Sequence, residues 1–168
     1  MTGAITTTVP ATRATSFSAT VGHAWCRQAT IKTSRPKGTN SRNCERAIAV
    51  NPDGTLAWPS GLIPGLTTHP AKVGDVIIIY ATGLGAVDSP PDNGQGSLDK
   101  LRQTITKPTV MVGGITANVL FAGLSPQFVG VNQLNVIIPN TAAGSNVPLQ
   151  IQVGGITSPD SVTIAVSN

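Results

Sequence analysis

The side chains whose types and spacing could do chemistry are densest in DSPPDNGQGSLD, residues 88–99. Carboxylate and amide oxygens recur there at near-alternate positions of a loop that also contains glycine. Calcium takes about six to eight oxygen ligands from a loop that can wrap around the ion. The spacing differs from that of an EF-hand, and the terminal glutamate is missing. Asp92, Asn93 and Asp99 are the first candidate ligands for Ca²⁺, with a polar, solvated loop as the simpler interpretation.

Candidate catalytic side chains are few. A Ser-His-Asp arrangement would have to use His69 with Asp75 or Asp88, and no pattern in the sequence supports it. Ser125 lies in GLSPQ, the nearest approach to the Gly-x-Ser-x-Gly nucleophile elbow. The final glycine and a following helix are missing, so we interpret Ser125 as a loop serine. These four residues are candidates by type, and the sequence requires no cofactor.

Positive charge is concentrated in residues 1–46. Seven of the eleven lysines and arginines lie there and one glutamate opposes them, so this arm carries +6 while residues 47–168 carry −2. A basic arm could bind nucleic acid. We favour a solvated basic tail, because Phe17 and Trp25 are the only aromatic residues interleaved with the charges. Apolar residues of the arm do not recur for long at the spacing of a strand or a helix, which predicts a loop or disorder.

Both cysteines, Cys26 and Cys44, belong to the same arm. A disulfide between them would stabilise the fold by roughly 3 kcal/mol in the chain-entropy model, but the sequence leaves their pairing open. The N-terminus lacks the apolar core of a signal peptide, and no run is long enough to cross a membrane. The Arg/Thr/Ser/Ala bias would suit a gene fragment or translation of a GC-rich gene in another frame.

The sequence predicts that the elements which position these residues are β-strands. Charged residues make up 11% of the chain, while 18 glycines and 13 prolines supply turns. The unbroken apolar run VIIIYA, residues 76–81, predicts a buried strand. Both of its faces are apolar, so we expect it at the centre of the fold, covered on both sides.

Further strands are predicted at regular intervals, with no credible helix. The motif VGGIT occurs twice, and each Gly-Gly pair suits a tight hairpin turn with positive φ. QLNVIIP alternates polar and apolar residues, which predicts one face in the core. A long loop is expected at 59–72. The predicted strands and strand pairs lie at residues 47–51, 56–58, 109–123, 133–139, 147–153 and 161–166. Seven or eight short antiparallel strands indicate an immunoglobulin-like β-sandwich over residues 47–168, preceded by the arm 1–46.

Three phrases carry a family resemblance: GDVIIIYATGLG (74–85), VMVGGITANVLFAGLSPQFVGVNQLNVIIP (110–139) and VPLQIQVGGITSPDSVTIAV (147–166). They resemble the uncharacterised C-terminal domain repeated across Solibacter and other Acidobacteria proteins, which is similar to bacterial immunoglobulin-like and IPT/TIG modules. The resemblance covers about residues 47–168. It implies a non-catalytic β-sandwich at the end of large exported proteins, hence an extracellular or cell-surface location.

Two functions from different classes follow. The first is a non-catalytic accessory or interaction module that presents loops or an edge strand to a protein or carbohydrate at the cell surface. Pairing of edge strands would also allow oligomers. The second is a small hydrolase of lactones or esters, assisted by Ca²⁺ held in the 88–99 loop. We favour the first because no catalytic constellation is present in the sequence.

Overall fold

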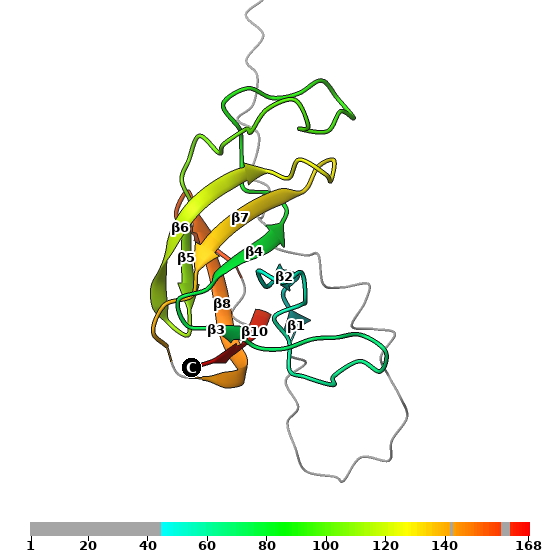
Figure 1. Ribbon diagram of the computed structural model, residues 1–168. Coiled ribbons are helices and arrows are strands. Elements are labelled where there is room, and N and C mark those ends of the chain that lie inside the picture. Colours follow the sequence, from blue (N-terminus) through cyan, green and yellow to red (C-terminus); the bar gives the residue numbers. More distant parts are fainter. Residues whose placement is uncertain (1–44, 142, 159–161) are drawn as a thin grey trace, which may run out of the picture.

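The computed structural model describes residues 45–141, 143–158 and 162–168, and throughout these residues the chain forms strands and loops with no helix (Figure 1). The prediction of an all-β protein is confirmed. Cys26, Cys44 and the arm as far as residue 44 lie outside the described residues. The disulfide, the disorder of the arm and its binding to nucleic acid therefore stay predictions. In the described residues, no helix has the length and hydropathy that crossing a membrane requires.

Ten strands form one curled sheet. Their bounds are β1 Glu45–Arg46, β2 Ala49–Val50, β3 Ala71–Lys72, β4 Val76–Ala81, β5 Thr109–Val112, β6 Ile115–Leu124, β7 Asn132–Ile137, β8 Gly144–Val153, β9 Ile156–Thr157 and β10 Val162–Ser167.

The sheet runs in the order β1-β10-β8-β5-β6-β7-β4-β2, with β3 added beside β10 and β9 beside β8. Most neighbours are antiparallel, but β1 and β3 both run parallel to β10. The prediction of antiparallel strands alone is therefore wrong. The two parallel strands have two residues each. Strands that short have no readable period, so β1 was assigned to the arm and β3 to the 59–72 loop.

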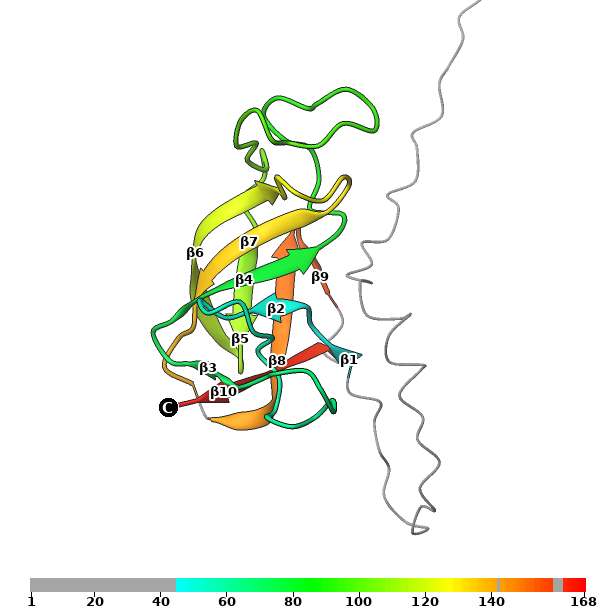
Figure 2. The ribbon, with the colours of Figure 1, turned by 45° about the vertical axis from the view of Figure 1, so that its right-hand side comes forward.

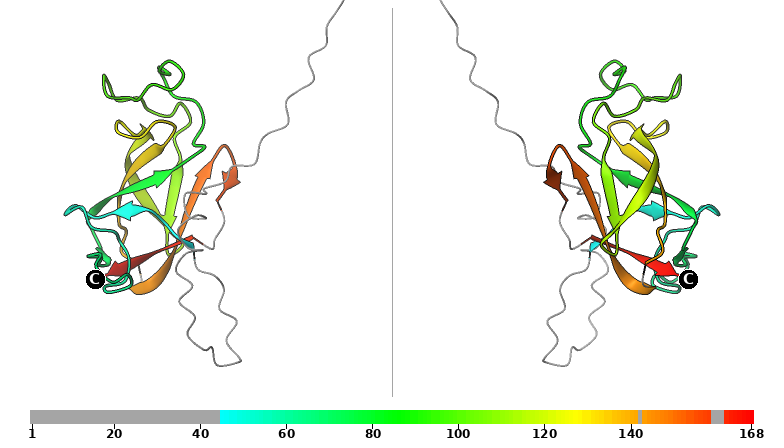
Figure 3. Two further views of the ribbon diagram at one scale, coloured as in Figure 1. Left: turned by 90° about the vertical axis from the view of Figure 1, so that its right-hand side faces the viewer. Right: turned by 90° about the vertical axis from the view of Figure 1, so that its left-hand side faces the viewer.

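The sheet curls because its two longest strands change partners along their length. β6 pairs with β5 through Ile115–Ala117 and with β7 through Asn118–Leu124, with a bulge at Leu120. β8 likewise pairs with β10 through its first half and with β5 through its second. A bulge bends and twists the strand that contains it. The result is a half-barrel with β10 and β8 on one side and β6, β7 and β4 curving over them (Figure 3).

The two ends of the curled sheet meet at residue 57. The Ala165 amide of β10 donates to the Ala57 carbonyl over 2.9 Å, and the Ala57 amide donates to the Ala49 carbonyl of β2 over 2.8 Å. Trp58 covers this seam, and its indole nitrogen donates to the Ala47 carbonyl over 2.8 Å. β1 and β2 are consecutive in the chain and lie close to β10 (Figure 2). Residues 47–58 thus connect the two edges of the sheet.

β4 is a strand, as predicted, but not the central one. It is next to last in the strand order, between β7 and β2. Ile77, Ile79 and Ala81 are buried, whereas Val76, Ile78 and Tyr80 face outward and are partly exposed. The prediction that both faces are covered is wrong. Apolar side chains on both faces identified the strand, but they did not reveal whether another part of the chain covers its outward face.

The alternating strands and the glycine hairpins form as expected. Asn132, Leu134 and Val136 of β7 are buried and their neighbours are half-exposed, which confirms one face in the core. Both Gly-Gly pairs sit in turns with positive φ, at 60° and 79° for Gly113 and Gly114. The core between the two sides of the sheet contains branched aliphatic side chains of β4, β5, β7, β8 and β10. Burial of each such side chain stabilises the fold by about 1.5–3 kcal/mol.

Candidate functional site

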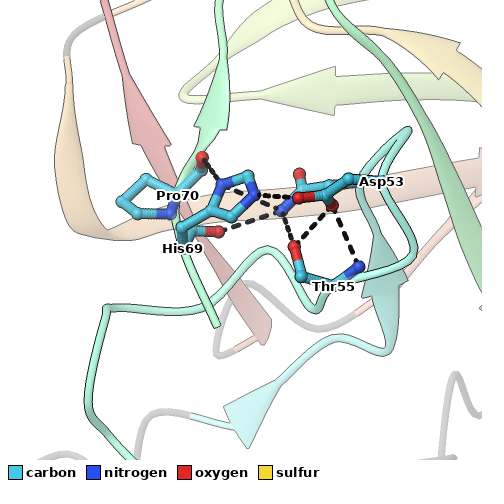
Figure 4. A network of polar contacts seen from close by, with 5 residues as sticks. Asp53, Thr55, His69 and Pro70 are labelled. Carbon is cyan, nitrogen blue, oxygen red and sulfur yellow. Dashed lines mark hydrogen bonds and ion pairs between the residues drawn. The ribbon is translucent and has the colours of Figure 1, made fainter. Parts of the chain in front are cut away.

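His69 lies in a polar network that joins the turn at residues 51–55 to the segment before β3 (Figure 4). Its Nε2 is 2.7 Å from Asp53 Oδ2, and its Nδ1 is 2.9 Å from the Pro70 carbonyl oxygen. Both partners are acceptors, so a doubly protonated ring satisfies both contacts, whereas a neutral ring satisfies one of them. Asn51 Nδ2 lies 3.4 Å from the same Nδ1. Asn51 Nδ2 donates to the His69 carbonyl oxygen over 3.0 Å, which fixes the backbone on the same side.

The electrostatics of this network favour the charged pair. The hydrogen bond to the Pro70 carbonyl, followed by the one to Asp53, raises the pKa of His69 above its usual 6.5. The hydrogen bond from His69, followed by those from the Thr55 hydroxyl and amide, lowers the pKa of Asp53 below its usual 3.8. Asp53 Oδ1 accepts both Thr55 bonds, at 2.7 and 3.0 Å. Such a turn is rigid because the aspartate accepts from its own backbone two residues on.

This arrangement does not match a hydrolytic triad. In a triad the histidine lies between the hydroxyl and the carboxylate and has one nitrogen free to take a proton. Here the carboxylate of Asp53 lies between the Thr55 hydroxyl and the His69 ring, and both ring nitrogens are engaged. The histidine therefore has a structural role in this conformation, since its ring connects two segments of the chain.

Asp75 and Asp88 are not the partners of His69 in the structure. Asp75 lies in the turn before β4, where its amide donates to the Lys72 carbonyl and its carbonyl accepts from Ile138. Asp88 Oδ1 accepts from the Gln103 amide over 3.1 Å and so joins the two ends of the 88–103 loop. Each aspartate thus closes a loop, and the carboxylate beside His69 comes from Asp53.

Arg102 organises the loop that the sequence marked for calcium. Its side chain is 7% exposed, and its guanidinium donates two hydrogen bonds to the Asp99 carboxylate, at 2.6 and 3.0 Å. It also donates to the Ser89 carbonyl over 2.5 Å and to the Ser97 hydroxyl over 3.0 Å. A planar guanidinium suits this multiple recognition because its donors are fixed in a fork. The loop from residue 88 to 102 is therefore folded around one buried cation (green, top of Figure 1).

The candidate calcium ligands do not converge on one ion in this conformation. Both oxygens of Asp99 are bonded to Arg102, which lowers the pKa of Asp99 to about 2. Asp92 and Asn93 are exposed at the far turn of the loop, where the Asp92 carbonyl accepts from Gln95. Within the described residues, no three His, Cys, Asp or Glu side chains gather as a metal-binding group. Calcium binding would require Asp99 to leave Arg102.

Ser125 is buried at the end of β6 and is only 2% exposed. Its amide donates to the Val131 carbonyl, which closes the 125–131 loop. Its hydroxyl oxygen has no hydrogen-bond partner among the described residues. A nucleophile must reach both a base and the substrate. The position of Ser125 supplies neither in this conformation.

A shallow pocket of about 120 Å³ lies beside β6, lined by Gln103, Thr104, Lys107 and residues 119–122. Sites for small organic ligands usually enclose about 300–1,000 Å³. This pocket is too small to hold a drug-sized substrate.

The sequence reasoning missed Asp53, Arg102 and Gly123. Asp53 lies in NPDGT, residues 51–55, between the predicted strands at 47–51 and 56–58. An aspartate that caps its own backbone is common in such a turn, so that signal was available. The role of Arg102 depends on the path of its loop, which no local pattern reveals. A Cβ added to Gly123 would lie 1.9 Å from the Arg102 carbonyl oxygen, so glycine is needed where this loop meets β6.

Comparisons with known protein families, with curated proteins and with solved structures find no match for this chain.

Proposed function

We propose that this chain is a non-catalytic accessory module of an exported bacterial protein, with an immunoglobulin-like β-sandwich that binds a partner at the cell surface. The observation that carries the proposal is the use of the reactive groups. Both nitrogens of His69 and both carboxylate oxygens of Asp99 are bonded to groups that hold loops in place. An enzyme would keep at least one such group open toward a substrate.

The immunoglobulin-like part of the proposal rests on the three phrases that resemble bacterial modules of that kind, and on the arrangement of the sheet. β10, β8 and β5 face β6, β7 and β4 across a shared aliphatic core, as the two layers of a sandwich do. The continuous path through β5 and β6 is the feature that departs from two separate layers. The extracellular location comes from the resemblance alone.

The 88–102 loop presents apolar side chains on a fixed frame. Leu98 is 81% exposed and Leu101 is 65% exposed, and each is next in sequence to one member of the Asp99–Arg102 ion pair. Exposed large apolar residues gathered on a well-held loop are characteristic of interaction sites. The loop thus supports a binding role better than a catalytic one.

The test is hydrolysis of a panel of lactones and simple esters by the purified full chain, with Ca²⁺ and with chelator. Circular dichroism first shows that the protein is folded. We expect no turnover above the heat-denatured sample in either condition. Turnover that disappears with chelator and in Asp92→Asn would overturn the proposal in favour of a calcium-assisted hydrolase. Turnover that survives chelation would overturn it as well.

A further inference from the structure

The strands β4, β7 and β6 contribute no charged side chain to their outward face, although Lys107 lies beside Phe121 at the pocket along β6. None of the residues in these three adjacent strands is Asp, Glu, Lys, Arg or His. Bringing an ionic ligand to such a surface costs desolvation that the side chains of these strands do not offset. The strands therefore favour a neutral ligand.

Aromatic rings lie on both sides of this face. The Tyr80 ring of β4 meets Phe128 edge to face, with ring centroids 5.5 Å apart and planes at 84°. Phe128 is 50% exposed, so much of its ring is open to solvent. On β6 the Phe121 ring lies over Gly123, where its Cζ is 2.7 Å from the position of an added Cβ. Rings in such positions offer flat apolar surfaces for stacking.

Two amides lie between the rings. Gln133 of β7 is opposite Tyr80 on one side and Gly123 on the other, and Asn135 is opposite Ile78 and Phe121. Gln133 Nε2 donates to Asn135 Oδ1 over 2.9 Å. No other side-chain hydrogen bond of Gln133 or Asn135 is formed among the described residues, so the acceptor Gln133 Oε1 and the donors of Asn135 Nδ2 remain available. Both side chains are half-exposed, so these groups can bond to a ligand.

We propose that this amide–aromatic face (Tyr80, Phe121, Phe128, Gln133 and Asn135) binds an uncharged polysaccharide; the proposal rests on the binding role proposed above and names the partner. A sugar ring has an apolar C–H face that stacks on an aromatic ring, and hydroxyl groups that donate to and accept from amides. Tyr80 and Phe121 are two strands apart and two residues out of level, so their backbones are about 12 Å apart, which spans more than one sugar unit. A protein partner and a second copy of this chain are the rival occupants, and the test separates them.

The experiment is native electrophoresis of the full chain in gels containing neutral polysaccharides (laminarin, xyloglucan, galactomannan and dextran) or charged ones (alginate and heparin). We expect retardation by at least one neutral polysaccharide, unchanged by salt because neutral contacts are not screened. Phe128→Ala and Asn135→Ala should each weaken binding by about tenfold, the loss expected for one stacked ring or one pair of hydrogen bonds. Ile156→Ala removes an exposed apolar side chain of β9, which pairs with β8 and lies outside this face, and should bind as the wild type does.

Three results would overturn the proposal: no retardation by any neutral polysaccharide, retardation by the charged ones alone, or binding that survives both face substitutions. Melting curves of the variants confirm that they fold. Sedimentation of the free protein tests the second copy, since a dimer that Phe128→Ala dissociates would assign the face to self-association instead. The hydrolysis panel decides the non-catalytic role by itself, so failure to bind glycans and failure of the proposed function give different results.

Discussion

Gly123 is the residue at which the 88–102 loop approaches the sheet most closely. A Cβ at this position would lie 1.9 Å from the Arg102 carbonyl oxygen, which is backbone and cannot swing away. Leu124 also donates to that carbonyl over 2.9 Å, so the loop cannot retreat without losing the bond. We expect Gly123→Ala to lower the free energy of unfolding by about 2 kcal/mol or more, measured by urea denaturation.

Gly96 provides the matched control for this substitution. It lies in the same loop, and an added Cβ would be 3.5 Å from the Pro126 carbonyl oxygen, an ordinary contact. Gly96→Ala should change stability by less than about 0.5 kcal/mol. Equal effects of the two substitutions would show that the loop does not press on β6 in solution.

His69 predicts a pH dependence of stability. Its raised pKa means that the network contributes fully below about pH 6.5 and is lost as pH rises through the folded-state pKa. The lowered pKa of Asp53 acts in the opposite direction, since its contribution is present above about pH 3.8 and lost as pH falls. The pair therefore stabilises the fold most between these limits. Both side chains are partly exposed, so the effect is small.

The measurement compares urea midpoints of the wild type and His69→Gln at about pH 5.5 and about pH 9. We expect a larger difference at the lower pH, because the imidazolium exists there. Asp53→Asn should reduce the pH dependence in the same way. A difference between wild type and variant that is equal at both pH values would contradict the ionic role of His69.

The two Gly-Gly hairpins test whether the effect of a substitution on stability depends on the residues packed against the turn. Gly113 and Gly154 occupy the same place in the repeated VGGIT motif, with φ of 60° and 57°. An added Cβ at Gly113 would lie 2.1 Å from Thr141 Oγ1, whereas at Gly154 it would meet nothing within 4 Å. Asparagine tolerates this backbone conformation. Gly154→Asn should therefore cost less than about 0.5 kcal/mol, and Gly113→Asn about 2 kcal/mol, by thermal unfolding.

Equal costs at the two positions would show that the turn itself, and not its contact with Thr141, decides stability. Gly114→Asn and Gly155→Asn serve as controls. Both positions have positive φ and open space around an added Cβ, so we expect them to behave alike.

The elements also show what the sequence could predict. The hairpins were predictable because positive φ at a Gly-Gly pair is a local requirement. β7 was predictable because alternation reports its buried face. The position of β4 depends on which strands pair with it, and such pairing is decided by the whole chain. The contact of His69 with Asp53, 16 residues away, depends in the same way on the path of the intervening loop. The sequence identified the polar residues of the 88–99 loop as candidate ligands, but it did not identify Arg102 as the partner of Asp99.

At the scale of the whole molecule, the sheet behaves as one structural unit because no pair of strands can separate alone. β6 and β8 each belong to two parts of the curled sheet, and Ala57 connects β10 to β2. Loss of any of these contacts exposes the common core. We therefore predict a single cooperative unfolding transition for residues 45–168.

Trp58 at the seam gives the sharpest test of this prediction. In Trp25→Phe the seam residue is the sole tryptophan, so its fluorescence reports the meeting point of the two edges while far-UV circular dichroism reports the strands. Urea curves from the two probes should coincide, and the dichroism curve of the variant should match that of the wild type. A fluorescence midpoint well below the dichroism midpoint would mean that the seam opens first, as a local unfolding unit. The sheet would then be held together by its strand ladders alone, and residues 47–58 would be an attachment to it.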